Sequence, residues 1–316
     1  MRTPIIIISI IVILLSTAFV VRFVLDKNPL EPKTTLKKNE SKNNSSQTDK
    51  PNNEVDEPSK LNVTIVNRWD VPEILKEISG HEYIDDQRFA CVQDEVGKIF
   101  IYNTSTGKIE KEIPFAGSGD YEGLALNGTT AYVLRADGQI FEIDYYNSGK
   151  PVIKQHKTHL TEKQDTEGMS FDKANNRLLI YLKGKEPQSD DYKGIYAFDL
   201  TSKQMKREPV FKIDLLNDLF ATSNSEKSKK GKKKKSGGIN PSEIAIHPST
   251  GEIYITDGRD PRLLIMDKTG VITTLIKLED SAFSQPECIS FSPTGQLFIS
   301  NEGTKKAGNI LEVNLK

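Results

Sequence analysis

Two hexapeptides, Tyr121-Glu122-Gly123-Leu124-Ala125-Leu126 and Thr166-Glu167-Gly168-Met169-Ser170-Phe171, decide the fold of this chain. Three other stretches repeat their arrangement: Ile78-Ser79-Gly80, Pro241-Ser242-Glu243-Ile244-Ala245-Ile246 and Pro286-Glu287-Cys288-Ile289-Ser290-Phe291. Each is followed by a turn and then by two short segments rich in β-branched and aromatic residues, such as 130–134 and 139–144. This alternation of apolar and polar residues predicts strands rather than helices.

The spacing of these stretches gives the architecture. Ser79, Glu122 and Glu167 follow one another at 43 and 45 residues, and Glu243 and Glu287 are 44 apart, whereas Glu167 and Glu243 are separated by 76. A period near 44 residues with strand patterning is typical of a β-propeller with four strands per blade. Without one insertion of about 31 residues, the segment 61–316 holds five such periods. We therefore predict an all-β, five-bladed β-propeller, with a six-bladed ring as the less suitable alternative because each blade would be too short.

The last repeat is too short for a complete blade. It runs only from Pro286 to Lys316, which leaves room for about three strands. The segment Val63-Thr64-Ile65-Val66 is predicted to supply the fourth strand and so to close the ring, because neither terminal strand would then keep an unpaired edge.

The N-terminal 60 residues differ from the rest in composition. Residues 1–25 are apolar, with Arg2 and Arg22 as the only charges before Asp26, and are long enough for a transmembrane helix. An uncleaved membrane anchor is the favoured interpretation, and a signal segment cleaved near Ser16-Thr17-Ala18 is the alternative. Residues 26–60 are rich in Lys, Asn, Ser, Pro and Glu, which predicts a disordered tether. We expect a single-pass membrane protein with an extracytoplasmic domain, or a secreted or periplasmic protein after cleavage.

Charge and cysteine content exclude several classes of function. The chain carries 43 Lys+Arg and 44 Asp+Glu, and this balance gives no whole-chain reason to expect a nucleic-acid partner. The insertion around 221–238 is lysine-rich, with seven lysines in the nine positions 227–235, and is either a solvated loop or a surface for anionic lipid, glycan or nucleic acid. Cys91 and Cys288 fall in the first and last repeats, which become neighbours in a closed ring, so two buried thiols or one disulfide are both compatible with the sequence.

The repeated phrases resemble those of the SdiA-regulated family. The resemblance rests on five ordered stretches: Glu77-Ile78-Ser79-Gly80, Gly119-Asp120-Tyr121-Glu122-Gly123, Thr166-Glu167-Gly168, Pro241-Ser242-Glu243-Ile244-Ala245-Ile246-His247-Pro248 and Ile299-Ser300-Asn301-Glu302. It implies a bacterial envelope protein with a five-bladed propeller related to NHL-repeat proteins, a calcium site in at least one member, and no established biochemical role. The sequence departs from the Glu-Gly phrase at Ser79, Ile244 and Cys288.

The recurring glutamates are the candidate metal ligands. If each phrase opens the innermost strand of its blade, these carboxylates converge on the central channel, where they would raise one another's pKa values or recruit a cation. Calcium suits such a set because it takes six to eight oxygen ligands in flexible geometry. The alternative is that the side chains bond to backbone and join neighbouring blades. The predicted ligands are Glu122, Glu167, Glu243 and Glu287, with Asp120 and Asn301 as further oxygen donors.

No catalytic motif accompanies these residues. The four histidines lack metal-site spacing, and there is no nucleophile elbow or phosphate loop. The favoured function is a membrane-tethered module that binds an unknown ligand or protein at the channel mouth. The alternative is a calcium-dependent phosphoesterase or lactonase, for which Arg135, Lys183 and Arg259 are the available basic residues.

Overall fold

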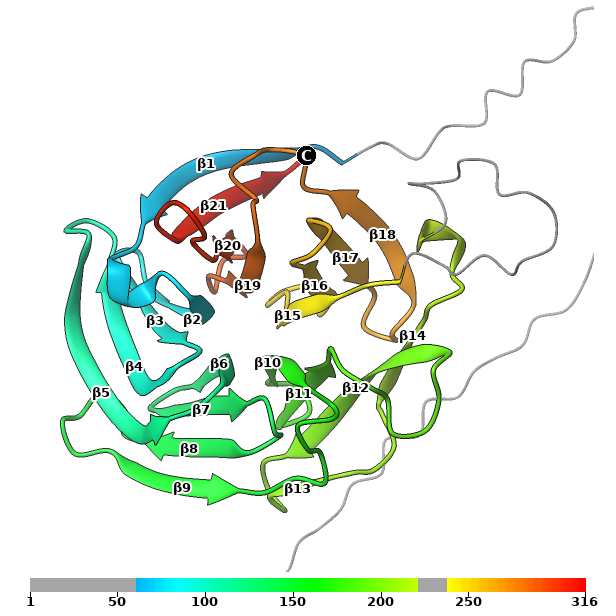
Figure 1. Ribbon diagram of the computed structural model, residues 1–316, viewed down its shortest axis with the longest axis horizontal. Coiled ribbons are helices and arrows are strands. Elements are labelled where there is room, and N and C mark those ends of the chain that lie inside the picture. Colours follow the sequence, from blue (N-terminus) through cyan, green and yellow to red (C-terminus); the bar gives the residue numbers. More distant parts are fainter. Residues whose placement is uncertain (1–60, 221–237) are drawn as a thin grey trace, which may run out of the picture. The chain divides into compact units, whose positions relative to one another are not determined.

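The computed structural model describes residues 61–220 and 238–316, and these residues form a ring of five antiparallel sheets (Figure 1). The predicted five-bladed, all-β propeller is therefore confirmed. The predicted membrane segment, the tether and nearly all of the lysine-rich insertion lie outside the described residues. Within the described residues, no helix has the length and apolar character needed to cross a membrane.

Each blade consists of strands ordered from the centre of the ring outward (Figure 1). Blade 1 contains β2 (Ile78–Asp85), β3 (Arg88–Gln93), β4 (Val96–Asn103) and β5 (Lys108–Ser118), and blade 2 contains β6 (Tyr121–Asn127), β7 (Thr130–Arg135), β8 (Ile140–Asp144) and β9 (Val152–His156). Blade 3 contains β10 (Thr166–Asp172), β11 (Arg177–Leu182), β12 (Tyr192–Asp199), β13 (Gln204–Met205) and β14 (Phe211–Asp214). Blade 4 contains β15 (Pro241–Ile246), β16 (Ile253–Asp257), β17 (Arg262–Met266) and β18 (Ile272–Lys277), and blade 5 contains β19 (Pro286–Phe291), β20 (Leu297–Asn301), β21 (Asn309–Leu315) and β1 (Val63–Asp70). Two single-turn 3-10 helices, Glu73–Leu75 and Asp218–Phe220, complete the described elements.

The ring closes as the sequence predicts. Strand β1 pairs antiparallel with β21, from Val63 opposite Leu315 to Asp70 opposite Asn309. The side chain of Trp69, on β1, then reaches two rings from different blades, at centroid distances of 6.4 Å from both Phe89 and Phe298. The chain's first and last described strands thus belong to one blade and share its hydrophobic contacts.

The outer edge of blade 3 is divided, which the sequence did not indicate. Strand β13 pairs with one end of β12 and β14 pairs with the other, so two short strands replace the single outer strand of the other blades. The extra length of this repeat therefore begins inside the blade, before the lysine-rich segment.

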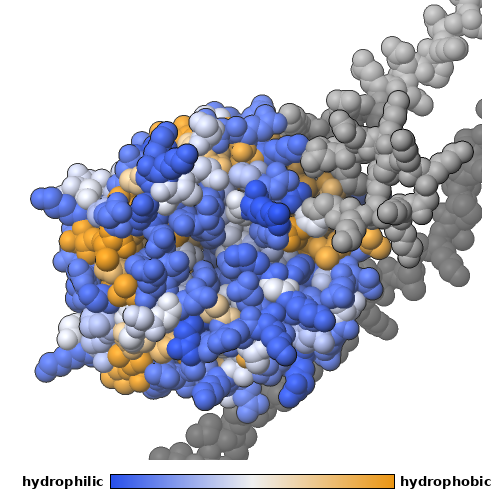
Figure 2. Space-filling view, in the orientation of Figure 1, coloured by the Kyte–Doolittle hydropathy of each residue, from blue (hydrophilic) through white to orange (hydrophobic). Residues whose placement is uncertain are grey.

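Hydrophobic side chains fill the junctions between blades. Five buried clusters occur in the described residues, and each combines residues of one blade with residues of the next. This arrangement follows from the strand pattern, because a propeller sheet packs against a neighbour on both faces. Figure 2 shows a face that is mainly hydrophilic, with hydrophobic side chains gathered in patches toward the rim.

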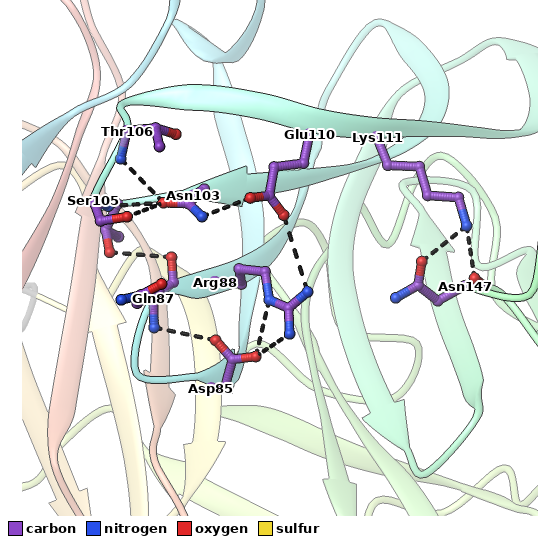
Figure 3. A network of polar contacts seen from close by, with 10 residues as sticks. Asp85, Gln87, Arg88, Asn103, Ser105, Thr106, Glu110, Lys111 and Asn147 are labelled. Atoms are coloured by element: carbon purple, nitrogen blue, oxygen red, sulfur yellow. Dashed lines mark hydrogen bonds and ion pairs between the residues drawn. The ribbon is translucent and has the colours of Figure 1, made fainter.

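Asparagine and aspartate side chains fix the outer turns. Asn103 Oδ1 accepts hydrogen bonds from the backbone N–H of Ser105 and Thr106, and the Asn103 Nδ2 donates to Glu110 (Figure 3). Such bonds within a turn let a polar residue end one strand and start the next. A separate contact in the same view joins blade 1 to blade 2, where the carbonyl oxygen and Oδ1 of Asn147 accept two bonds from the Lys111 ammonium (Figure 3).

Candidate functional site at the channel mouth

A β-bulge opens each of the five innermost strands. The pairing with the second strand shifts between Ile78 and Gly80, Tyr121 and Gly123, Thr166 and Met169, Pro241 and Glu243, and Pro286 and Cys288. A bulge leaves one residue out of the ladder and changes the direction of its side chain. The residues at this equivalent position are Ser79, Glu122, Glu167, Ser242 and Glu287.

In blades 1 and 4 the bulged residue is a serine that joins two blades. Ser79 Oγ donates a 2.6 Å hydrogen bond to the carbonyl oxygen of Tyr121, and Ser242 Oγ donates a 2.5 Å bond to that of Pro286. Both acceptors are the first residue of the next blade's innermost strand. In these two blades a serine therefore makes the kind of backbone staple that was considered for the glutamates, and Glu243 makes another.

The register corrects the alignment of the fourth repeat by one residue. Ser242, and not Glu243, is equivalent to Glu122, and Glu243 takes the place of Gly123 and Gly168. Aligning by the glutamate itself fails because the glutamate of the fourth repeat stands one position later in its strand than those of the other repeats.

Glu243 is buried at a blade junction. Its Oε1 accepts hydrogen bonds from the backbone N–H of Met169 at 2.5 Å and of Ile244 at 3.0 Å, and its Oε2 lies 3.7 Å from Cys288 Sγ. Burial is the main cause of a pKa well above the usual value for Glu243. The predicted role of Glu243 as a metal ligand stays a prediction, but its oxygens are engaged in packing two blades together.

The remaining three predicted ligands, Glu122, Glu167 and Glu287, occupy the equivalent bulge position in blades 2, 3 and 5. Lys183, the first residue after β11, places its Nζ 2.5 Å from Glu167 Oε1. Burial raises the pKa of Glu122, and repulsion from Glu167 raises it further. Burial likewise raises the pKa of Glu167 against the opposing effect of Lys183, and it raises that of Glu287 to about 7.

Further carboxylates surround this group. Burial and the neighbouring acidic side chains raise the pKa of Asp94 to about 6, and the same causes raise that of Glu302. Lys183 responds in the opposite direction: burial alone would lower its pKa, but Glu167 and Glu287 raise it. The mouth therefore holds more carboxyl groups than Lys183 can neutralise, which favours uptake of a cation or of protons.

A cleft of about 430 Å³ adjoins the carboxylates. Its lining includes Lys183, Arg259, Ser242, Gln285 and Glu287, from blades 3, 4 and 5 and the segments that connect them. Two of the three candidate basic residues, Lys183 and Arg259, thus converge. The third does not, because Arg135 is paired with Asp137 at 2.7 Å and its guanidinium carbon lies 5.7 Å from the centroid of the Phe141 ring.

The carboxylate oxygens of Glu122, Glu167 and Glu287 are of the donor type that calcium prefers, but the Lys183 ammonium already pairs with Glu167. Within residues 61–220 and 238–316, no three His, Cys, Asp or Glu side chains are already arranged to hold a metal ion. Of the two further donors, Asp120 is hydrogen-bonded to Glu122, and Asn301 donates from Nδ2 to Asn309. Asn301 Oδ1 is buried and has no hydrogen-bond partner among the described residues.

The cysteines and His81 lie together at the junction of blades 5 and 1. Both thiols are free and buried, and the backbone N–H of His81 lies 2.9 Å from Cys288 Sγ. Burial lowers the pKa of His81 to about 3, so its ring is neutral. Of the two predicted alternatives for Cys91 and Cys288, the structure shows the free thiols.

Comparisons with known proteins show the fold. No family model matches the chain, and no curated protein matches it by sequence. Among solved structures, a glutaminyl cyclase from Myxococcus xanthus superposes with a TM-score of 0.57 and 14% identity, covering 82% of this chain and 99% of that one. A PQQ-bound aldose sugar dehydrogenase from Streptomyces coelicolor gives a TM-score of 0.50 and 12% identity over 82% of this chain and 99% of that one. Both similar proteins are enzymes by name, and at this identity the likeness establishes that this chain has a β-propeller scaffold.

Proposed function

We propose that the chain is a membrane-tethered, extracytoplasmic propeller of the SdiA-regulated type that binds a ligand or partner at the channel mouth with the help of calcium. The proposal of family and location rests on the resemblance of the ordered phrases, the apolar residues 1–25 and the polar residues 26–60. The observation that supports the binding role is the convergence of Glu122, Glu167 and Glu287 beside a cleft lined by Lys183 and Arg259.

Each group would have a distinct task. Glu122, Glu167 and Glu287 would hold the cation, whose positive charge would in turn orient a ligand oxygen. Arg259 is exposed and lies at the cleft, where a guanidinium pairs well with a carboxylate or phosphate group. We therefore expect a ligand with an anionic group and hydroxyl or carbonyl oxygens.

Calorimetry with calcium tests the cation site. The full-length chain, purified in a mild detergent, is titrated with CaCl₂ beside a variant that carries Glu122→Gln, Glu167→Gln and Glu287→Gln. We expect saturable heat from the wild type and none from the triple variant, because the amides remove three negative charges and keep the side-chain size. Glu162 is exposed and lies in the segment that connects blade 2 to blade 3. Glu162→Gln is therefore the matched control and should bind calcium as the wild type does. Absence of saturable heat from the wild type would remove calcium from the proposal.

A calcium-dependent hydrolase is the second candidate. Its supporting observation is that Lys183 and Arg259 line the same cleft as Glu287, which places basic side chains next to the proposed cation. Phosphate-ester and lactone substrates, each assayed with and without calcium, separate the two functions. Turnover that needs calcium and disappears in Arg259→Ala would establish hydrolysis, whereas a binding module gives none.

Fractionation tests the proposed location. An uncleaved anchor keeps the chain in the membrane fraction after alkaline carbonate extraction, with residues 1–25 present in its intact mass. A cleaved signal segment gives a soluble, shorter chain outside the cytoplasm. Recovery of the full-length chain in the cytosolic fraction would refute the extracytoplasmic assignment.

A further inference from the structure

Lys183 belongs both to the carboxylate group and to the cleft, and this inference rests on the proposed function of that site. We propose that Lys183 is a tethered counter-ion of the channel mouth, which a divalent cation must displace before the carboxylates can hold it. Calcium would then bind in competition with one of the chain's own side chains.

The ammonium already takes the position of a cation among the carboxylates. Lys183 Nζ lies 2.5 Å from Glu167 Oε1, and the Glu167 side chain is only 4% exposed. Among the described residues, this lysine is the cation that pairs with Glu167. The same ammonium interacts electrostatically with Glu122, Glu287 and Glu302. Because two cations repel at such short range, calcium and the ammonium cannot both occupy the centre of this group.

The backbone of Lys183 is fixed, but its side chain is not enclosed. Its backbone N–H donates to Asp165 at 2.9 Å, and its carbonyl oxygen accepts a 2.6 Å bond from Lys193 Nζ. The Lys183 side chain itself is 47% exposed. The side chain therefore has room to leave Glu167 without any change in the strand.

The adjoining cleft receives the displaced side chain. Lys183 is one of the residues that line it, together with Arg259. Calcium binding would thus move one positive charge from the carboxylates to the cleft, where it increases the attraction for an anionic group.

A lysine at this position is particular to blade 3. The first residue after the second strand is Asp94 in blade 1, Ala136 in blade 2, Gly258 in blade 4 and Glu302 in blade 5. Neither the strand nor the turn requires a cation there, since the other four blades form without one. The positive charge of Lys183 is therefore explained by the carboxyl groups around it, namely Glu167, Glu122 and Glu287.

Calcium titration of lysine variants of the full-length chain tests this competition. Lys183→Met keeps the length of the side chain and removes its charge, and we expect it to lower the calcium Kd at least tenfold. Lys183→Arg keeps the charge and should stay within twofold of the wild type, as should Lys185→Met, an exposed lysine on the same loop. If Lys183→Met does not fold, Lys183→Gln serves for the same comparison.

Chemical labelling gives an independent measurement on the wild type. Brief amine acetylation followed by peptide mass spectrometry should modify Lys183 several-fold faster with calcium than without it, while Lys185 is unchanged. The inference fails if the wild type and Lys183→Met bind calcium with equal affinity, although the proposed function then stands. If neither binds calcium, both the inference and the calcium site are wrong.

Discussion

The glycine of the repeated phrase makes a sharp test of how the blades pack. A Cβ atom added at Gly168 would lie 2.6 Å from Glu243 Oε1, 2.7 Å from Glu243 Cα and 2.8 Å from the backbone nitrogen of Ile244. Ordinary contact begins near 3.4 Å, so strands β10 and β15 would have to separate by roughly 0.6–0.8 Å. Flexible side chains can turn away from such a contact, but two of these three atoms are backbone.

We expect Gly168→Ala to destabilise the propeller by about 2–4 kcal/mol. Overpacking of this kind costs ~1–3 kcal/mol, and loss of the hydrogen bond from Met169 N–H to Glu243 adds ~1 kcal/mol. For a domain of this size the melting temperature should fall by roughly 5–15 °C. Gly117→Ala, where nothing lies within 4 Å of the added atom, is the control and should change stability by less than about 0.5 kcal/mol.

Urea unfolding followed by the fluorescence of Trp69, the one tryptophan of the chain, measures both variants. This ring lies where blade 5 meets blade 1, so its signal reports loss of ring closure. The double variant Gly168→Ala with Glu243→Ala removes the carboxylate and keeps the backbone contacts, and should remain destabilised. An unchanged urea midpoint for Gly168→Ala, or full recovery in the double variant, would refute the explanation by backbone contact.

Two other predictions concern stability. Ser79→Ala and Ser242→Ala should each lower the free energy of unfolding by about 1 kcal/mol, because each removes one hydrogen bond between blades. The double variant should lose the sum, because the two bonds lie at different blade junctions. Denaturant midpoints measure these changes, and equal stability of all three variants would contradict the prediction. Burial raises the pKa of Glu82 from 4.5 to about 8, although part of the side chain contacts solvent. Since the folded state keeps the proton longer than the unfolded chain, its contribution to stability is complete below pH 4.5 and is lost as the pH rises to about 8. Glu82→Gln should therefore flatten the fall in stability over this range and stabilise the protein by ~1–3 kcal/mol at pH 8, as measured by urea unfolding at several pH values; an unchanged slope would show that Glu82 is not the group responsible.

The 44-residue period of the sequence was sufficient to predict the five-bladed ring, but it was not sufficient to predict which side chains form the site. Five blades and the closing strand follow from spacing, because each blade buries its two faces against neighbours and needs a constant length. The direction of one side chain follows from the bulge, which occupies a single residue and leaves no mark in composition. Glu243 was aligned with Glu167 because both are glutamates, whereas the hydrogen-bond register aligns Ser242 with Glu167.

The partners of the site residues could not be read from the sequence. Lys183, Arg135 and Arg259 all lie at or just after the end of the second strand of a blade, and all three were equal candidates for the mouth. Only the three-dimensional arrangement shows that Arg135 is neutralised by Asp137 two residues away, while Lys183 reaches a carboxylate 16 residues earlier. The divided outer edge of blade 3 was missed for a related reason, since β13 contains only two residues and has no pattern to detect.

The pairing of β1 with β21 also constrains the order of folding. Asn67 and Glu312, which share a hydrogen bond across this pair, are 245 residues apart, whereas the strands that pair inside blades 1 to 4 are near neighbours in the chain. The first strand of the ring to be synthesised must therefore wait for the last before it can pair. Contacts between residues so far apart in the chain slow folding, because the entropy cost of closing the loop comes before the contacts can stabilise the closed ring. Ring closure is thus expected to be a late and slow kinetic step, and the edge of β1 remains open to other chains until it is complete.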